Sequence, residues 1–102
     1  MHKRTRALQI PPEVKERVWH RDHERCIICG SRWAAPVAHF IPRSHGGLGV
    51  EQNTVTLCGV CHYNFDNTTL RPVLREVIRE YLINEYPGWD EQNLYYKKGV
   101  TL

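Results

Sequence analysis

The sequence predicts a small α+β fold in which a two-stranded hairpin lies between helices. The first observation is a pair of short apolar runs, Val37–Ile41 and Thr54–Leu57, joined by a segment that contains three glycines. The second is an amphipathic pattern over residues 70–87, which is typical of a helix that covers such a hairpin. The third is the presence of two Cys-x-x-Cys pairs that flank the hairpin, since a core this small benefits from an additional staple.

Length and charge limit the possible functions. The chain has 102 residues and a formal net charge of +3, which predicts one small domain. The N-terminal segment lacks the apolar core of a signal peptide, and no run is long enough to span a membrane, so we expect a cytoplasmic protein. Basic residues gather at positions 2–6 and at Lys97-Lys98. This distribution suits a polyanionic partner, although solvated tails would explain it equally well.

The N-terminal third is expected to hold an arm, a helix and a turn. Residues 1–11 form a basic arm, of which residues 1–9 are expected to be disordered or extended. Proline is well tolerated in a first helical turn, so Pro11-Pro12 opens a helix over residues 12–22. Its core side is expected to comprise Val14, Val18 and Trp19, and its polar side Lys15, Glu16, Arg17 and Arg21. A knuckle turn follows at residues 26–30, with Trp33 packed beneath it.

The remaining elements follow from the positions of proline and glycine and from the periodicity of apolar residues. Pro42 ends the first strand, and the glycine-rich loop 43–52 lacks the lysine of a phosphate-binding loop. A helix is expected from Gly59 or Val60 to Asn67, and a longer one over residues 70–87. The apolar stripe of the long helix comprises Leu74, Val77, Ile78, Tyr81 and Leu82, and its other face Arg71, Arg75, Glu76, Arg79 and Glu80. Residues 88–102 are expected to form a tail with one short helical turn around Asp90–Leu94.

The four cysteines are Cys26, Cys29, Cys58 and Cys61. Two Cys-x-x-Cys pairs can close one tetrahedral zinc site, and in a reducing compartment this is favoured over disulfides. Four protein ligands leave no open position for chemistry, so such a zinc ion would be structural. Unrelated buried cysteines or a redox pair are the alternatives. Taken alone, the pattern indicates a zinc ribbon and says nothing about catalysis.

The order of motifs over residues 12–68 resembles that of the HNH endonucleases, in particular their zinc-containing four-cysteine branch. A Cys pair is followed by a strand with His39, a glycine turn, Asn53, a second strand, the second Cys pair and His62. The resemblance implies a ββα-metal core, also called a His-Me finger. It also implies hydrolysis of DNA phosphodiester bonds with one Mg²⁺ or Mn²⁺ ion.

The resemblance also assigns roles to individual residues. His39 would be the general base that activates water, and Asn53 would bond backbone groups across the loop to hold it. His62 would bind the catalytic ion, and Asp66, one helical turn later, would be a second ligand. Each has a plainer alternative. His39 could be packed on a strand, Asn53 an ordinary turn residue and Asp66 a solvated carboxylate, and zinc could recruit His62.

One departure from the family pattern concerns the ligand set. The family usually carries Asp or His immediately before the general base, whereas this chain has Ala38. The resemblance therefore implies a poorer set of ligands for the catalytic ion. In the following loop Arg43 could hold a phosphate by two hydrogen bonds, and His45 is expected to be an exposed loop residue. The remaining candidates for DNA contact are Lys3, Arg4 and Arg6.

The leading interpretation is a small HNH endonuclease that cuts DNA. Its size resembles that of phage and prophage HNH proteins, some of which work with the terminase during genome packaging. Two alternatives stay open. One is a catalytically weak or inactive zinc-ribbon module that binds DNA, with Ala38 as the sign of lost activity. The other is an adaptor whose long amphipathic helix docks on another protein.

Overall fold

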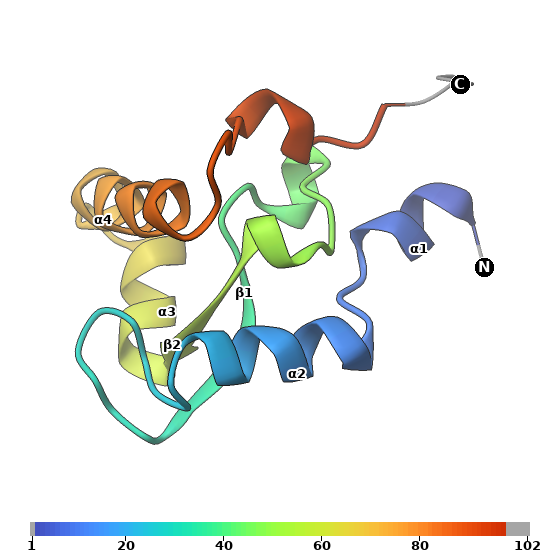
Figure 1. Cartoon of the computed structure of the whole chain (residues 1–102). Coiled ribbons are helices and arrows are strands. Elements are labelled where there is room, and N and C mark those ends of the chain that lie inside the picture. Colours follow the sequence, from blue (N-terminus) through green and yellow to red (C-terminus); the bar gives the residue numbers. More distant parts are fainter. Residues whose placement is uncertain (1, 98–102) are drawn as a thin grey trace.

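A central hairpin with helices around it makes up the fold (Figure 1). The computed structural model describes residues 2–97. The helices are α1 (Lys3–Leu8), α2 (Pro12–Arg21), α3 (Gly59–Asn67) and α4 (Arg71–Glu85), and the strands are β1 (Ala34–His39) and β2 (Thr54–Cys58). Short 3-10 turns lie at η1 (Arg43–His45), η2 (Glu51–Asn53) and η3 (Glu91–Leu94). The predicted α+β fold with its hairpin between helices is confirmed.

The hairpin is antiparallel and contains a bulge. Ala35 lies opposite Leu57 and Ala38 opposite Val55, so β1 advances three residues where β2 advances two. The extra residue falls at Pro36–Val37, where a proline can be accommodated because the ladder is already interrupted. The strand starts at Ala34, three residues before the predicted Val37, and ends at His39 rather than at Ile41. After the bulge, Ala38 is buried in the core.

Apolar residues from the hairpin, α3 and α4 form one core. Its fully buried members include Phe40, Ile41, Val55, Phe65, Ile78 and Leu82. Ile78 and Leu82 confirm the predicted stripe of α4, whereas Val77 is 45% exposed, contrary to expectation, because the core contacts a narrower strip of the helix. The predicted turn near residue 90 is present as η3, and Leu94 is buried there. The segment after α4 is therefore packed rather than a free tail; Lys98 and the rest of residues 98–102 lie outside the described residues.

Two expectations about the first third of the chain are wrong. Residues 3–8 form α1 rather than a disordered or extended segment, because the His2 ring accepts a hydrogen bond from the Arg4 N–H and the Leu8 side chain is buried. Trp33 is 90% exposed instead of lying beneath the knuckle. Instead, Ile27 and Ile28 of the knuckle itself pack against the core.

Arg21, on the polar side of α2, is part of a buried hydrogen-bond network. Its guanidinium donates to both carboxylate oxygens of Asp22 and to the backbone carbonyls of Glu51 and Thr54. Asp22 is 2% exposed and also accepts hydrogen bonds from the Thr56 N–H and the Tyr81 hydroxyl. The end of α2 is thereby tied to β2 and α4. The carboxylate raises the pKa of Arg21 although burial lowers it.

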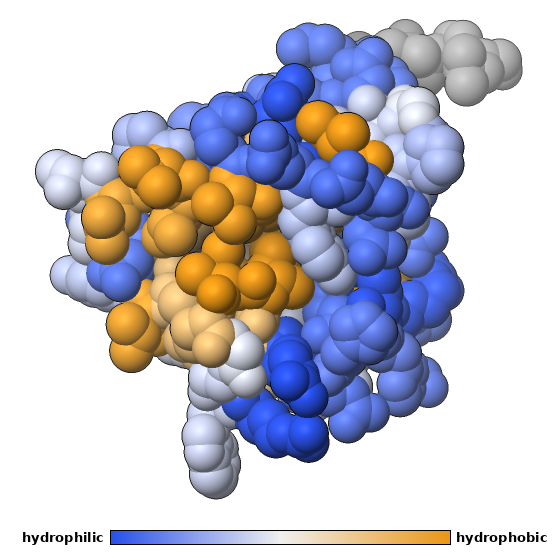
Figure 2. All heavy atoms as spheres, turned by 60° about the vertical axis from the view of Figure 1, so that its left-hand side comes forward, coloured by the Kyte–Doolittle hydropathy of each residue, from blue (hydrophilic) through white to orange (hydrophobic). Residues whose placement is uncertain are grey.

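A surface of aliphatic side chains covers α3 and α4 (Figure 2). Its exposed members are Val60, Leu70, Val73 and Val77. This aliphatic surface is the continuation of the α4 stripe beyond the part that the core covers. Within the described residues, none of the helices has the length and apolar character needed to cross a membrane.

Candidate functional site

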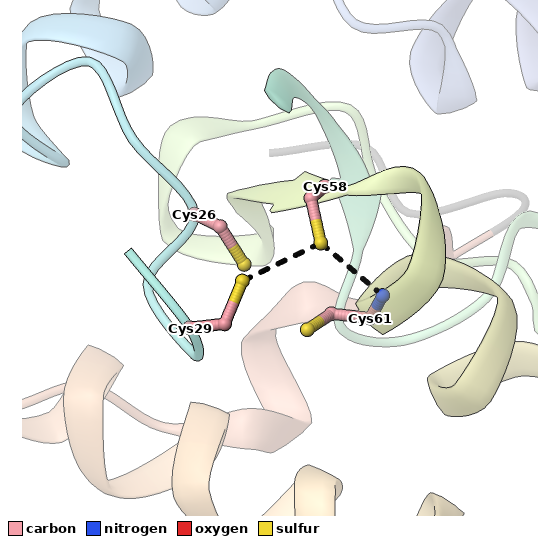
Figure 3. Close-up of side chains that lie close together, drawn as sticks. All are labelled: Cys26, Cys29, Cys58 and Cys61. Atoms are coloured by element: carbon pink, nitrogen blue, oxygen red, sulfur yellow. Dashed lines mark hydrogen bonds between the residues drawn. The ribbon is translucent and has the colours of Figure 1, made fainter. Parts of the chain in front are cut away.

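The four cysteines converge from three elements (Figure 3). Cys26 and Cys29 lie in the turn after α2, Cys58 ends β2, and Cys61 lies in the first turn of α3. Their Sγ atoms are all within 4.8 Å of one another. The turn closes through a hydrogen bond from the Gly30 N–H to the Cys26 carbonyl, with Gly30 at a φ of 79°, which glycine adopts without strain.

This cluster has the donors and the spacing of a four-coordinate metal site. Burial raises the pKa of Cys26, but backbone N–H groups outweigh it and lower that pKa to about 7. Burial and the neighbouring Cys58 thiol raise the pKa of Cys61. Closely spaced thiols have unequal pKa values, because ionisation of one thiol disfavours ionisation of the next. A bound cation removes this conflict, so the four residues fit a metal ion that prefers thiolates.

A second site is a pocket of about 520 Å³ on the other side of β1 from the core. Its lining comes from β1, the loop that follows, α3 and the start of α4. The polar lining residues are His39, Arg43, Ser44, His45, His62, Asp66 and Arg71. The pocket thus brings together all three residues that the HNH resemblance places around the reacting phosphate.

His39 is half-buried at the edge of this pocket. Its Nε2 lies 2.8 Å from the carbonyl oxygen of Leu8. A carbonyl oxygen only accepts, so Nε2 carries the proton and Nδ1 keeps a lone pair. Burial lowers the pKa of His39, the Leu8 carbonyl raises it, and the positive charge of Arg43 lowers it. The net direction is downward, which keeps the imidazole neutral and able to accept a proton at physiological pH.

His62 and Asp66 lie one helical turn apart on α3. The His62 Nε2 and an Asp66 carboxylate oxygen are 3.1 Å apart, and their side chains are 33% and 46% exposed. An imidazole and a carboxylate at this separation suit a divalent cation such as Mg²⁺ or Mn²⁺. Within residues 2–97 the cysteines are the only cluster of three or more potential ligands, so this pair has no third protein ligand beside it.

Asn53 holds the backbone that follows His39. Its Oδ1 accepts from the Ile41 N–H at 2.7 Å, and its Nδ2 donates to the carbonyls of Ile41 at 3.2 Å and Leu48 at 2.8 Å. The Asn53 backbone carbonyl accepts from the Phe40 N–H at 2.8 Å. With the side chain fully buried, these four bonds fix the path of the chain immediately after the histidine. The assignment of Asn53 to the catalytic apparatus stays a prediction.

Ala38 does not face the pocket. It is fully buried in the core, whereas Val37 and His39, on either side of it, line the pocket. Successive residues of a strand point to opposite faces, so a longer side chain at position 38 would enter the core rather than reach the His62–Asp66 pair. The position on the pocket face is 37, and Val37 is 37% exposed there.

The sequence-predicted cations fall into two groups. Arg43 is exposed and lines the pocket, as does His45, which is exposed as expected. Lys3, Arg4 and Arg6 are exposed on α1 and do not line it, although the C-terminal end of the same helix contacts His39. The arm cations are therefore placed beside the pocket rather than within it.

Sequence reasoning missed Arg71 as a single residue. Its guanidinium lies 4.8 Å from the centre of the Phe65 ring and donates to the Phe65 carbonyl at 3.0 Å. This holds the cation in the wall of the pocket that His39 also lines. Arg71 follows the HNH motif in sequence, and the helical pattern placed it on the polar face of the long helix, whose arginines could be solvated or contact DNA, so no sequence signal separated it from the other arginines of α4.

Comparison with known proteins identifies the central segment. The family model described as HNH endonuclease matches residues 26–67, which run from the first cysteine pair through the hairpin to the end of α3. The comparisons with curated proteins and with solved structures gave no match. The matched segment contains the cysteine cluster, His39, Asn53, His62 and Asp66, all placed as described above. The central segment of the chain, residues 26–67, is therefore similar to the HNH endonuclease family.

Proposed function

We propose that the chain is a metal-dependent endonuclease that hydrolyses DNA phosphodiester bonds, with His39 as the general base. The observation that carries the proposal is that His39, His62 and Asp66 line one pocket inside the segment that matches the HNH family. A single pocket then holds a proton acceptor and a pair of ligands suited to a divalent ion. These are the groups that phosphodiester hydrolysis requires.

His39 has the protonation state that the reaction needs. With Nε2–H donated to the Leu8 carbonyl, Nδ1 is the atom that takes the proton from the attacking water. Its lowered pKa keeps this lone pair available at neutral pH. Removal of a positioned general base typically costs about 10²–10⁴-fold in rate.

The other pocket residues orient the phosphate and offset its charge. His62 and Asp66 would hold one Mg²⁺ or Mn²⁺ ion, which supplies electrostatic stabilisation of the charge that develops on the phosphate and the leaving oxygen. The guanidinium groups of Arg43 and Arg71 flank the same space and can each bind two phosphate oxygens. Because the protein provides only two ligands for the ion, these two arginines would supply additional positive charge beside the phosphate.

The cysteine cluster would hold a structural zinc ion. Cys26, Cys29, Cys58 and Cys61 fit it by donor type and mutual distance. The cluster joins the turn after α2 to the junction between β2 and α3, so it would lock the helix that carries His62 against the hairpin that carries His39. Its role is then to fix the geometry of the pocket rather than to take part in the reaction.

DNA would lie across the pocket and along the exposed cations of α1. Lys3, Arg4 and Arg6 offer phosphate contacts without reading base sequence. Binding through such contacts releases counterions, so affinity should fall steeply as salt rises. An affinity that is indifferent to salt would contradict this placement.

The experiment is plasmid cleavage by the zinc-loaded protein with added Mg²⁺ or Mn²⁺. Wild-type protein should cut, and His39→Ala should lose about 10²–10⁴-fold in rate while keeping its zinc content and melting temperature. His20→Ala is the matched control, because His20 is exposed on α2 and does not line the pocket. Wild-type protein that fails to cut with either metal would overturn the nuclease assignment, and an unimpaired His39→Ala would overturn the role of His39.

A catalytically weak or inactive DNA-binding module is the second candidate. The specific observation in its favour is the pair of protein ligands, His62 and Asp66, without a third beside them. Salt-dependent DNA binding without cleavage would identify it. A role beside a phage terminase rests on the resemblance, and the aliphatic surface of α3 and α4 offers a place for a protein partner (Figure 2). Binding of purified terminase subunits, abolished by Val73→Asp, tests that role.

A further inference from the structure

We infer that the N-terminal arm, defined as residues 3–10, is a positioning segment that fixes the tautomer and orientation of His39. This inference deepens the proposed function and rests on it, since His39 matters as a general base only if the pocket is catalytic. The arm lies outside residues 26–67, the segment that matches the HNH family, so it is an addition of this chain to the domain.

The contact that carries the inference is the hydrogen bond between the His39 Nε2 and the Leu8 carbonyl oxygen at 2.8 Å. A neutral imidazole can carry its proton on either nitrogen, and the partner of one nitrogen decides which. A carbonyl oxygen cannot donate, so docking of the arm selects the Nε2–H tautomer and leaves Nδ1 as the basic atom. Without the arm, His39 would lose its hydrogen-bond partner and part of its burial.

The arm is seated by a close fit of its backbone and of one apolar side chain. The Leu8 side chain is 3% exposed, and the Gly49 N–H donates to the Ala7 carbonyl at 3.0 Å. Gly49 is also a point of close approach, because a Cβ built there would overlap the Gln9 carbonyl. Only glycine at this position allows the backbone of the arm to lie against the loop. Gln9 and Ile10 then form one wall of a cavity of about 440 Å³ that His39 also lines.

The same segment offers cations to a polyanion. Lys3 and Arg4 are exposed on α1, whose last residue provides the carbonyl that holds His39. Phosphates bound to α1 would therefore favour the docked arm, and the docked arm holds the base. Binding of DNA and positioning of His39 are joined through one helix of six residues.

Gly49→Ala in the full-length, zinc-loaded protein tests the inference. The added methyl group meets backbone atoms of the arm and should displace it. Gly59→Ala is the matched control, because a Cβ at Gly59 meets nothing within 4 Å. The first readout is the ¹⁵N spectrum of the His39 ring at neutral pH, assigned by comparison with His39→Ala. Wild type and Gly59→Ala should show the proton on Nε2, and Gly49→Ala should show a mixture of both tautomers.

The second readout is DNA cleavage, analysed as separate changes in kcat and KM. Gly49→Ala should lower kcat by about 10- to 100-fold, since small misplacements of catalytic groups have effects of this size, while KM changes little. The double variant Lys3→Gln/Arg4→Gln should raise KM, because phosphate contacts are lost, and should leave the His39 tautomer of the DNA-free protein unchanged. This separation distinguishes positioning from a general loss of stability or of DNA affinity.

Deletion of residues 2–8 removes the carbonyl altogether and serves as a second variant if Gly49→Ala does not fold. A wild-type spectrum with the proton on Nδ1 would overturn the inference without any variant. Wild-type tautomer and kcat in Gly49→Ala, or in the deletion variant, would overturn it as well. If the wild-type protein does not cut DNA, the proposed function fails, and the spectra still decide whether the arm sets the tautomer.

Discussion

Replacement of Asn53 by alanine should be one of the most damaging single changes near the pocket. The side chain is fully buried and makes three hydrogen bonds, one from the Ile41 N–H and two to the carbonyls of Ile41 and Leu48. Leaving the buried N–H without a partner costs about 1–3 kcal/mol, and each lost bond to a carbonyl about 0.5–1.5 kcal/mol. We therefore expect Asn53→Ala to lower the free energy of unfolding by about 2–6 kcal/mol, from a total of about 5–15 kcal/mol for a domain.

Equilibrium unfolding in urea, with zinc present and followed by circular dichroism, measures this loss. Asn53→Asp keeps the acceptor for the Ile41 N–H but turns a carboxylate toward the Leu48 carbonyl, so it should be at least as unstable as Asn53→Ala. Asn84→Ala is the control, since Asn84 is exposed within α4 and alanine is the better helix former. A loss below about 1 kcal/mol for Asn53→Ala would refute the assignment of these three bonds as the support of the loop behind His39.

Four further predictions concern the metal sites, pH and strand β1. Chelation of zinc should unfold the protein, and Cys29→Ser should weaken zinc retention, as elemental analysis and circular dichroism will show. Burial lowers the folded-state pKa of His39 below its ordinary 6.5, so its contribution to stability is complete above that pH and is lost as pH falls through the folded value. The acidic limb of the kcat/KM–pH profile, which reports the pKa of the free enzyme, should likewise lie below pH 6.5. Ala38→Asp should cost at least about 4 kcal/mol of stability, since a carboxyl group in the core has a strongly raised pKa. Val37→Asp should be tolerated and should tighten Mn²⁺ binding in calorimetric titration, because Val37 lines the pocket.

The position of Ala38 shows why strand geometry has to be known before a ligand can be assigned. The sequence shows only that the residue before His39 is small where the family usually carries a ligand. In the structure, the bulge at Pro36–Val37 fixes which residues of β1 face the core, and Ala38 is among them. A shift of one residue moves every side chain of a strand to the opposite face. The bulge arises from the pairing of β1 with β2, so it cannot be inferred from the sequence of β1 alone.

The sequence by itself determined the elements whose signal is local. The cysteine spacing, the strand around His39, the helix after Cys58 and the stripe of Ile78 and Leu82 are all visible as patterns within a few residues of one another. Such patterns can be recognised in a sequence because turn residues, helix periodicity and ligand spacing each involve residues only a few positions apart.

Only the tertiary structure decided which distant groups meet. Three features each join segments far apart in sequence: the docking of Leu8 on His39, the position of Arg71 in the pocket wall, and the hydrogen bonds of Arg21 and Asp22 to β2. Their side chains carry no local signal, because a polar residue on a helix looks solvated until a neighbour covers it. Packing of the whole chain places the N-terminal arm against His39. It also places Arg71, which the sequence puts on a polar helix face, in the wall of the pocket, where it can bind a phosphate.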